Sequence, residues 1–159
     1  MPLHVTHESD WGLGWIAPEP VRMRRASHAL AADGGVWLLD PVDRPQPRQP
    51  LVEAVTVVWR RWWREVALWW PERRVLAVPE ALGTAPYFRA PGRPLGVHPA
   101  LRLTPPRALA RFEPVWLLPG HGGPLGGPEA APAVREAIAG ARREIPRWLA
   151  GLPRACRRR

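Results

Sequence analysis

Proline and glycine are the residues that most constrain how this chain can fold. The 159 residues include 22 Pro and 14 Gly. Proline removes a backbone donor and fixes φ, and glycine tolerates turn conformations, so the helices and strands between them must be short. Hydrophobic residues make up 46% of the chain, and a chain of this length can bury a core of its own. The sequence therefore predicts a single globular domain built from short elements.

Hydrophobic runs between the prolines predict the strands. Residues 33–35 read Asp-Gly-Gly, a hairpin-turn sequence between the first two runs. Residues 71–73 join the hydrophobic runs 64–70 and 74–80 in a second predicted hairpin. The proline-rich residues 41–50 and 86–106 are predicted to be loops. The predicted strands are 21–32, 36–40, 53–60, 64–70, 74–80 and 114–119.

Two helices are expected in the second half of the chain. Residues 105–112 carry proline in what would be the first turn of a short helix. A longer amphipathic helix is expected from about Pro132. Pro146 should kink or end it, because proline cannot donate a hydrogen bond inside a helix. The apolar positions that define the longer helix are Val134, Ile138, Ala141, Ile145 and Trp148.

The charge of the chain is carried by arginine and lies in its second half. All 23 Lys+Arg residues are arginine, and the formal net charge is +9. Residues 81–159 hold 13 Arg and 4 acidic residues, so they account for the whole net charge. Such asymmetry suits a nucleic acid or an acidic partner, whereas a compositional bias toward arginine explains it without any partner. The absence of lysine excludes a Walker phosphate loop and Schiff-base chemistry.

Membrane and redox features predict a cytoplasmic protein. No apolar stretch is long enough to span a bilayer. The N-terminal MPLHVTHESDWG lacks the basic and apolar regions of a signal peptide. Cys156 is the only cysteine, so neither an internal disulfide nor a cysteine zinc cage can form. Because the sequence has neither a long apolar stretch nor a signal-like N-terminus, we also expect no membrane association.

Three stretches together resemble the metallo-β-lactamase superfamily. They are DGGVWLLDP at 33–41, REVALWWPERRVLAVPEALG at 64–83, and VWLLPGHGGPL at 115–125. They are similar to that family's early strand ending in aspartate, its paired strands, and its Pro-Gly-His-Gly turn between a strand and the closing helix. The resemblance implies an α/β fold, an abbreviated αββα sandwich with mixed and antiparallel sheets and a C-terminal amphipathic helix. A single domain of this kind would occupy residues 1–153, followed by a basic tail at 154–159.

Most metal-ligand positions of that family lack the expected residue here. The family's HxHxDH motif is absent, and no histidine stands between His28 and His98. Only His121 matches a ligand position outright, and Glu80 stands where the resemblance places a bridging aspartate. Zinc catalysis needs about three protein ligands and an open fourth position. The candidate metal ligands are therefore His121 and Glu80, with zinc or iron as the metal if a residual site functions, and no cofactor otherwise.

Each candidate ligand also has a structural interpretation. His121 can be the middle of a tight turn between two glycines, and Glu80 an acid paired with an arginine. A third ligand could come from His4, His7 or Asp10, but we expect His4 and His7 to be solvated residues of a loose N-terminus. The remaining candidates are expected to be structural, and they are His28, His98 and Asp40.

The segment between Asp40 and Glu65 is shorter than its counterpart in the resembling family. That counterpart holds a strand, the HxHxDH motif and helices, so one half of the sandwich should lack strands and a covering helix. Exposed sheet edges and apolar faces are normally covered or paired. We therefore expect a homodimer in which a second copy supplies the cover.

These observations predict a catalytically degenerate protein with a binding or assembly role, and no catalytic residue is assigned. The first alternative is a metal-dependent hydrolase with a site rebuilt around His121, Glu80 and a histidine from another subunit. The second is a basic nucleic-acid-binding module, suggested by the Trp-Arg cluster WRRWWREVALWW at 59–70. Alternation in that cluster also places several tryptophans on an inward strand face, and Glu65 interrupts its positive run.

Overall fold

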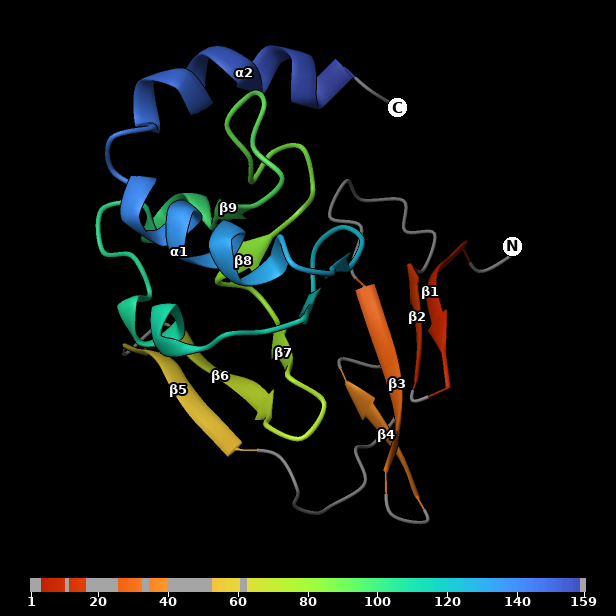
Figure 1. Cartoon of the computed structure of the whole chain (residues 1–159). Coiled ribbons are helices and arrows are strands. Elements are labelled where there is room, and N and C mark those ends of the chain that lie inside the picture. The colour runs from red at the N-terminus through yellow and green to blue at the C-terminus, as the bar shows by residue number, and fades with distance from the viewer. Residues whose placement is uncertain are drawn as a thin grey trace.

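The chain folds into a mixed α/β structure, so the predicted α/β class is confirmed (Figure 1). The computed structural model describes residues 4–10, 12–16, 26–32, 35–39, 53–60 and 63–157. Asp40, the turn residues Asp33 and Gly34, and the predicted loop 41–50 lie outside the described residues.

The first sheet is an antiparallel meander of four strands in the order β1-β2-β3-β4. They are β1 (His4–Ser9), β2 (Gly12–Ile16), β3 (Ala26–Ala32) and β4 (Gly35–Leu39). β3 and β4 confirm the predicted early hairpin. β1 corrects the expectation of a loose terminus at His4 and His7, because this strand pairs with β2. Val5 and Thr6 are β-branched and favour a strand, and strand pairing ties the terminus down.

The second sheet is mixed and has five strands in the order β11-β10-β7-β6-β5. They are β5 (Glu53–Arg60), β6 (Trp63–Trp70), β7 (Val75–Val78), β10 (Trp116–Pro119) and β11 (Leu125–Gly126). The strands predicted at 53–60, 64–70 and 74–80 are confirmed, together with the hairpin that joins the last two. β10 also confirms the strand predicted within 114–119. It runs parallel to β7, and residues 79–115 form the crossover that a parallel pair requires.

The crossover contains short elements separated by proline-rich loops. They are β8 (Leu82–Gly83), β9 (Gly96–Val97), and the 3₁₀ helices η1 (Pro99–Leu101) and η2 (Arg107–Arg111). β8 and β9 pair as a two-stranded sheet. The short helix predicted at 105–112 is confirmed as the 3₁₀ helix η2, which begins after Pro106.

The predicted amphipathic helix is interrupted near Pro146, as expected, and forms two α-helices. They are α1 (Ala130–Gly140) and α2 (Ile145–Arg157). The break comes before Pro146, which lies in the first turn of α2, where a missing backbone donor costs nothing. A continuous helix would require that donor and would place the proline ring against the preceding turn. α2 continues to Arg157, so the predicted basic tail at 154–159 is helical over 154–157.

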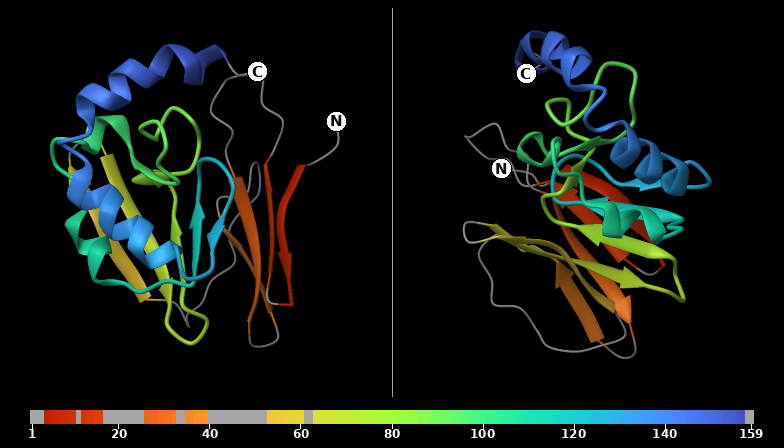
Figure 2. Two further views of the ribbon diagram at one scale, coloured as in Figure 1. Left: turned by 45° about the horizontal axis from the view of Figure 1, so that its top comes forward. Right: turned by 90° about the vertical axis from the view of Figure 1, so that its left-hand side faces the viewer.

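The five-stranded sheet forms the middle layer of the molecule. One of its faces, including Leu76, Val78 and Leu117, packs against α1 and η2 in the main core. The alternate residues, including Val75 and Leu118, belong to a smaller cluster on the opposite face. Figure 2 shows α1 over the first face and the four-stranded sheet beyond the second. Successive side chains of β7 and β10 point to opposite faces of the sheet, and both faces are packed.

Trp148 holds α2 against the crossover. Its indole Nε1 donates a hydrogen bond of 2.7 Å to the carbonyl oxygen of Tyr87. The guanidinium of Arg102 lies 4.6 Å from the centroid of the Trp148 ring. Arg102 is itself buried and donates to the carbonyl oxygen of Phe88 at 2.6 Å. The loop that carries Tyr87 is thus fixed from two sides, although it has little regular structure.

Candidate functional site

The two predicted metal ligands lie together where two parallel strands end. Glu80 follows β7, and His121 follows β10. Because β7 and β10 are parallel neighbours, their carboxyl ends share one edge of the sheet, which is where α/β folds commonly place ligands. His121 Nε2 lies 2.8 Å from Glu80 Oε2. Glu80 therefore pairs with a histidine, which corrects the alternative expectation that it pairs with an arginine.

Both ring nitrogens of His121 are bonded to other side chains of the protein. The ring is buried, with 1% of its surface exposed. Nδ1 lies 2.9 Å from the hydroxyl of Tyr87, and Nε2 contacts Glu80. Burial, assisted by the charge of Glu80, raises the pKa of Tyr87 to about 12. The hydroxyl therefore keeps its proton and donates to Nδ1, which leaves Nε2–H to donate to Glu80.

The turn that carries His121 is fixed by the backbone around it. The carbonyl oxygen of His121 accepts from the backbone N–H groups of Thr84 and Ala85 at 3.0 and 3.2 Å. Gly122 has φ +98°, and a Cβ there would lie 2.5 Å from the Ala85 nitrogen. A Cβ at Gly120 would lie 2.1 Å from the Pro79 carbonyl oxygen. Both glycines are therefore required by close backbone approach, whatever residue stands between them.

A buried carboxylate from β6 supports the Glu80 side of this cluster. Glu65 is only 5% exposed, and its Oε1 accepts from the backbone nitrogens of Glu80 and Ala81 at 2.9 and 2.8 Å. Burial raises the pKa of the Glu65 carboxyl above its ordinary value of 4.5, although the two backbone donors lower it. Glu65 was not among the predicted site residues. The alternation of β6 could have identified it, because it shares a strand face with Trp63 and Trp69.

His98 lies near this cluster in a structural position. Its Nδ1 accepts from the backbone nitrogen of Ala100 at 3.2 Å and so caps η1. Its ring makes edge contacts with Trp63 and Phe88, at centroid distances of 4.7 and 5.4 Å. Burial lowers the pKa of His98, while the charge of Glu80 raises it. His98 therefore caps η1 and packs against two aromatic rings, which agrees with the structural role expected for it.

Around His121 the described residues bring together two potential metal ligands, His121 and Glu80. Across the described residues, no three or more His, Cys, Asp or Glu side chains are grouped so that they could hold a metal ion. Ligand atoms about 2.0–2.2 Å from a tetrahedral zinc lie roughly 3.4 Å apart. The 2.8 Å between His121 Nε2 and Glu80 Oε2 is instead a hydrogen-bond length. No catalytic step is therefore assigned to a metal here.

The N-terminal histidines and His28 belong to the four-stranded sheet. His4 and His7 lie in β1, and Asp10 follows that strand. His28 is buried, and its Nε2 lies 3.3 Å from the carbonyl oxygen of Pro119. This contact joins the two sheets close to the turn that holds His121, so His28 has the structural role that was expected for it.

Tryptophans of the Trp-Arg cluster pack inward. Trp63 and Trp69 lie against the main core, and Trp70 is buried on the opposite face of the sheet. Trp69 also contacts Phe112, with 5.1 Å between ring centroids. Rings that pack in a core are not available to stack on bases. These three residues therefore favour the core-packing interpretation of the cluster.

Comparisons with protein-family models, curated proteins and solved structures found no match to this chain. Within the described part of the chain, neither helix combines the length and the apolar character needed to cross a membrane.

Proposed function

We propose that this protein is a catalytically degenerate member of the metallo-β-lactamase superfamily with a binding or assembly role and no hydrolytic activity. The observation that carries the proposal is the bonding of His121, whose two ring nitrogens are held by Glu80 and Tyr87. A metal would have to take one of these nitrogens from a partner inside the protein. The order of strand, Pro-Gly-His-Gly turn and closing helix supports the proposed ancestry, and the self-contained cluster supports the loss of chemistry.

The assembly part of the proposal rests on the layers of the fold. Figures 1 and 2 show α1 on one side of the five-stranded sheet and the four-stranded sheet on the other. Within the described residues, neither helix lies over the outer face of the four-stranded sheet. A second copy of the chain would cover this face in a homodimer. Sedimentation equilibrium over a range of concentrations tests this part, and a monomer at every concentration would contradict it.

Metal analysis of protein purified without a histidine tag tests the loss of chemistry. We expect zinc and iron well below one equivalent after dialysis against buffer supplemented with each metal. Stoichiometric metal would instead support the alternative hydrolase, with His121, Glu80 and a subunit-donated histidine as ligands. In that case His121→Ala should lose the metal, whereas His7→Ala tests for a ligand from the N-terminal strand.

A further inference from the structure

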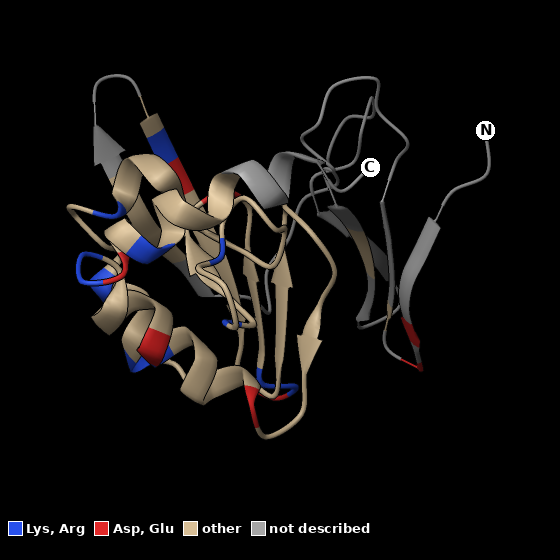
Figure 3. Ribbon diagram, turned by 90° about the horizontal axis from the view of Figure 1, so that it is seen from above, with Lys and Arg blue, Asp and Glu red and all other residues tan. Residues whose placement is uncertain are grey.

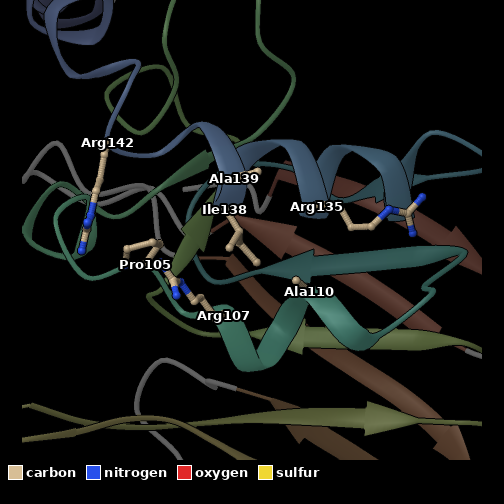
Figure 4. A pocket seen from close by; sticks show the side chains of 7 residues that line it. All are labelled: Pro105, Arg107, Ala110, Arg135, Ile138, Ala139 and Arg142. Carbon is tan, nitrogen blue, oxygen red and sulfur yellow. The ribbon is translucent and has the colours of Figure 1, made fainter.

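A surface cavity of the protein is lined by three arginines and four apolar residues. It has a volume of about 420 Å³ and lies between η2 and α1. Figure 4 shows its lining, and Figure 3 marks the arginines of this helical layer in blue. The lining residues are Pro105, Arg107, Ala110, Arg135, Ile138, Ala139 and Arg142. No acidic side chain is among them.

Two of the three arginines pair with no carboxylate in the part of the chain that the structure describes. Arg135 forms an ion pair with Glu113. Arg142 uses its Nε to donate to the carbonyl oxygen of Leu103 at 2.8 Å, which fixes the side chain and leaves its terminal nitrogens for another acceptor. Within the described residues, neither Arg107 nor Arg142 has a carboxylate within ion-pair distance.

The placement of these charges divides the cavity into a charged end and an apolar wall. In Figure 4 the guanidinium groups of Arg107 and Arg142 lie on either side of Pro105, and that of Arg135 points away from them. Ala110 and Ile138 supply apolar surface between the two elements. The volume is in the range of small-molecule sites, which combine mostly apolar walls with a few placed polar groups.

We propose that this cavity binds a small organic phosphate monoester, with the phosphate between Arg107 and Arg142 and the organic group against Pro105, Ala110 and Ile138. Two guanidinium charges match the two negative charges of a phosphate monoester, and each guanidinium can donate two parallel hydrogen bonds to phosphate oxygens. A carboxylate would satisfy only one of the charges. The inference deepens the proposed binding role, because it names a ligand class.

Calorimetric titration with phenyl phosphate, inorganic phosphate and benzoate tests the proposal on the full chain. We expect phenyl phosphate to bind with a Kd of about 1 mM or tighter, and inorganic phosphate and benzoate each to bind about tenfold more weakly. Arg107→Ala and Arg142→Ala should each weaken phenyl phosphate binding at least about tenfold, since each removes charge-assisted hydrogen bonds. Ala139→Leu should weaken it by filling the cavity without changing any charge.

Arg143→Ala is the matched control. Arg143 is exposed, adjoins Arg142 and does not line the cavity, so its loss should change the Kd less than about twofold. Equal losses in all three arginine variants would overturn the proposal, because binding would then follow net charge alone. No phenyl phosphate binding at about 10 mM, or equal affinity for benzoate, would also overturn it.

A single-stranded oligonucleotide that displaces phenyl phosphate and binds more tightly would assign the surface to nucleic acid and refute the small-molecule assignment. The metal analysis is independent of all these outcomes. A protein that binds neither metal nor phenyl phosphate would keep the proposed loss of chemistry and lose only this ligand. A protein that holds stoichiometric metal would lose the proposed function even if phenyl phosphate binds.

Discussion

The His121 cluster and the cavity between η2 and α1 show opposite uses of polar side chains. In the cluster, the ring of His121 is buried and bonded at both nitrogens by Glu80 and Tyr87. In the cavity, Arg107 and Arg142 lack acidic partners within the described residues and face solvent. Polar groups that satisfy one another inside a protein stabilise it, whereas charges without internal partners can interact with a ligand. The histidine first suggested by the sequence thus lies where polar groups satisfy one another, and the arginines lie where we propose that a ligand binds.

The largest effect expected in the structural region comes from Gly122→Ala. The added methyl group would combine a positive φ with a backbone clash against Ala85, so we expect a loss of more than about 4 kcal/mol in the free energy of unfolding. Urea denaturation measures it. Gly123→Ala is the control, since a Cβ there meets no atom within 4 Å. Similar stabilities for the two variants would show that the turn is not constrained as described.

His121→Ala should cost about 3 kcal/mol, because it leaves Glu80 and Tyr87 without their partner and opens a cavity. Tyr87→Phe removes one hydrogen bond and should cost about 1 kcal/mol. Thermal and urea unfolding measure both. If His121→Ala unfolds like the unmodified protein, the cluster does not have the structural role assigned to it here.

Glu65 gives a smaller effect that depends on pH. Glu65→Ala leaves two backbone donors without their acceptor and should cost about 2 kcal/mol, whereas Glu65→Gln keeps an acceptor and removes the charge. Since burial raises the pKa of Glu65 in the folded state above its ordinary value of 4.5, folding holds this proton more tightly than the unfolded chain does. The unmodified protein should therefore lose stability relative to Glu65→Gln as pH rises from 4.5 through the folded-state pKa. Unmodified protein that keeps or gains stability relative to Glu65→Gln over this range would contradict the assignment.

The smallest effect on stability is expected from the arginines of the cavity. Arg107→Ala should change the free energy of unfolding by less than about 0.5 kcal/mol, because the side chain is exposed and makes no ion pair within the described residues. Its effect should be on ligand binding alone. A large loss of stability would remove the contrast between the two regions.

The sequence predicts the local parts of this fold better than its long-range parts. β5, β6, β7 and β10 are predicted because each is a hydrophobic run, rich in β-branched residues in β5 and ending at or next to a proline in β6, β7 and β10. β1 was missed, because pairing with β2 ordered a segment that looked like a free end. The apolar spacing from Val134 to Trp148 is helical throughout, so the interruption is predicted by Pro146 alone, and the structure places it just before that proline.

The candidate site is also predicted only in part, because local sequence signals identify some of its residues and long-range contacts bring in the others. His121 and Glu80 stand beside recognisable strands, and the structure brings them together. Tyr87 lies in a proline-rich stretch with no periodicity, and its contact with His121 depends on the crossover between β7 and β10. Glu65 interrupts the positive run of the Trp-Arg cluster, and strand alternation along β6 places it on the core face.

Trp148 links the C-terminal helix to the crossover, and the link has a consequence for how the molecule opens. The indole bonds the Tyr87 carbonyl and lies beneath Arg102, so α2 and the loop around Tyr87 should detach together as one cooperative unit. Amide protons in both segments should then exchange with solvent at matched rates, slower than exposed turns and faster than β7. Any event that loosens α2 would release a loop more than fifty residues earlier in the chain.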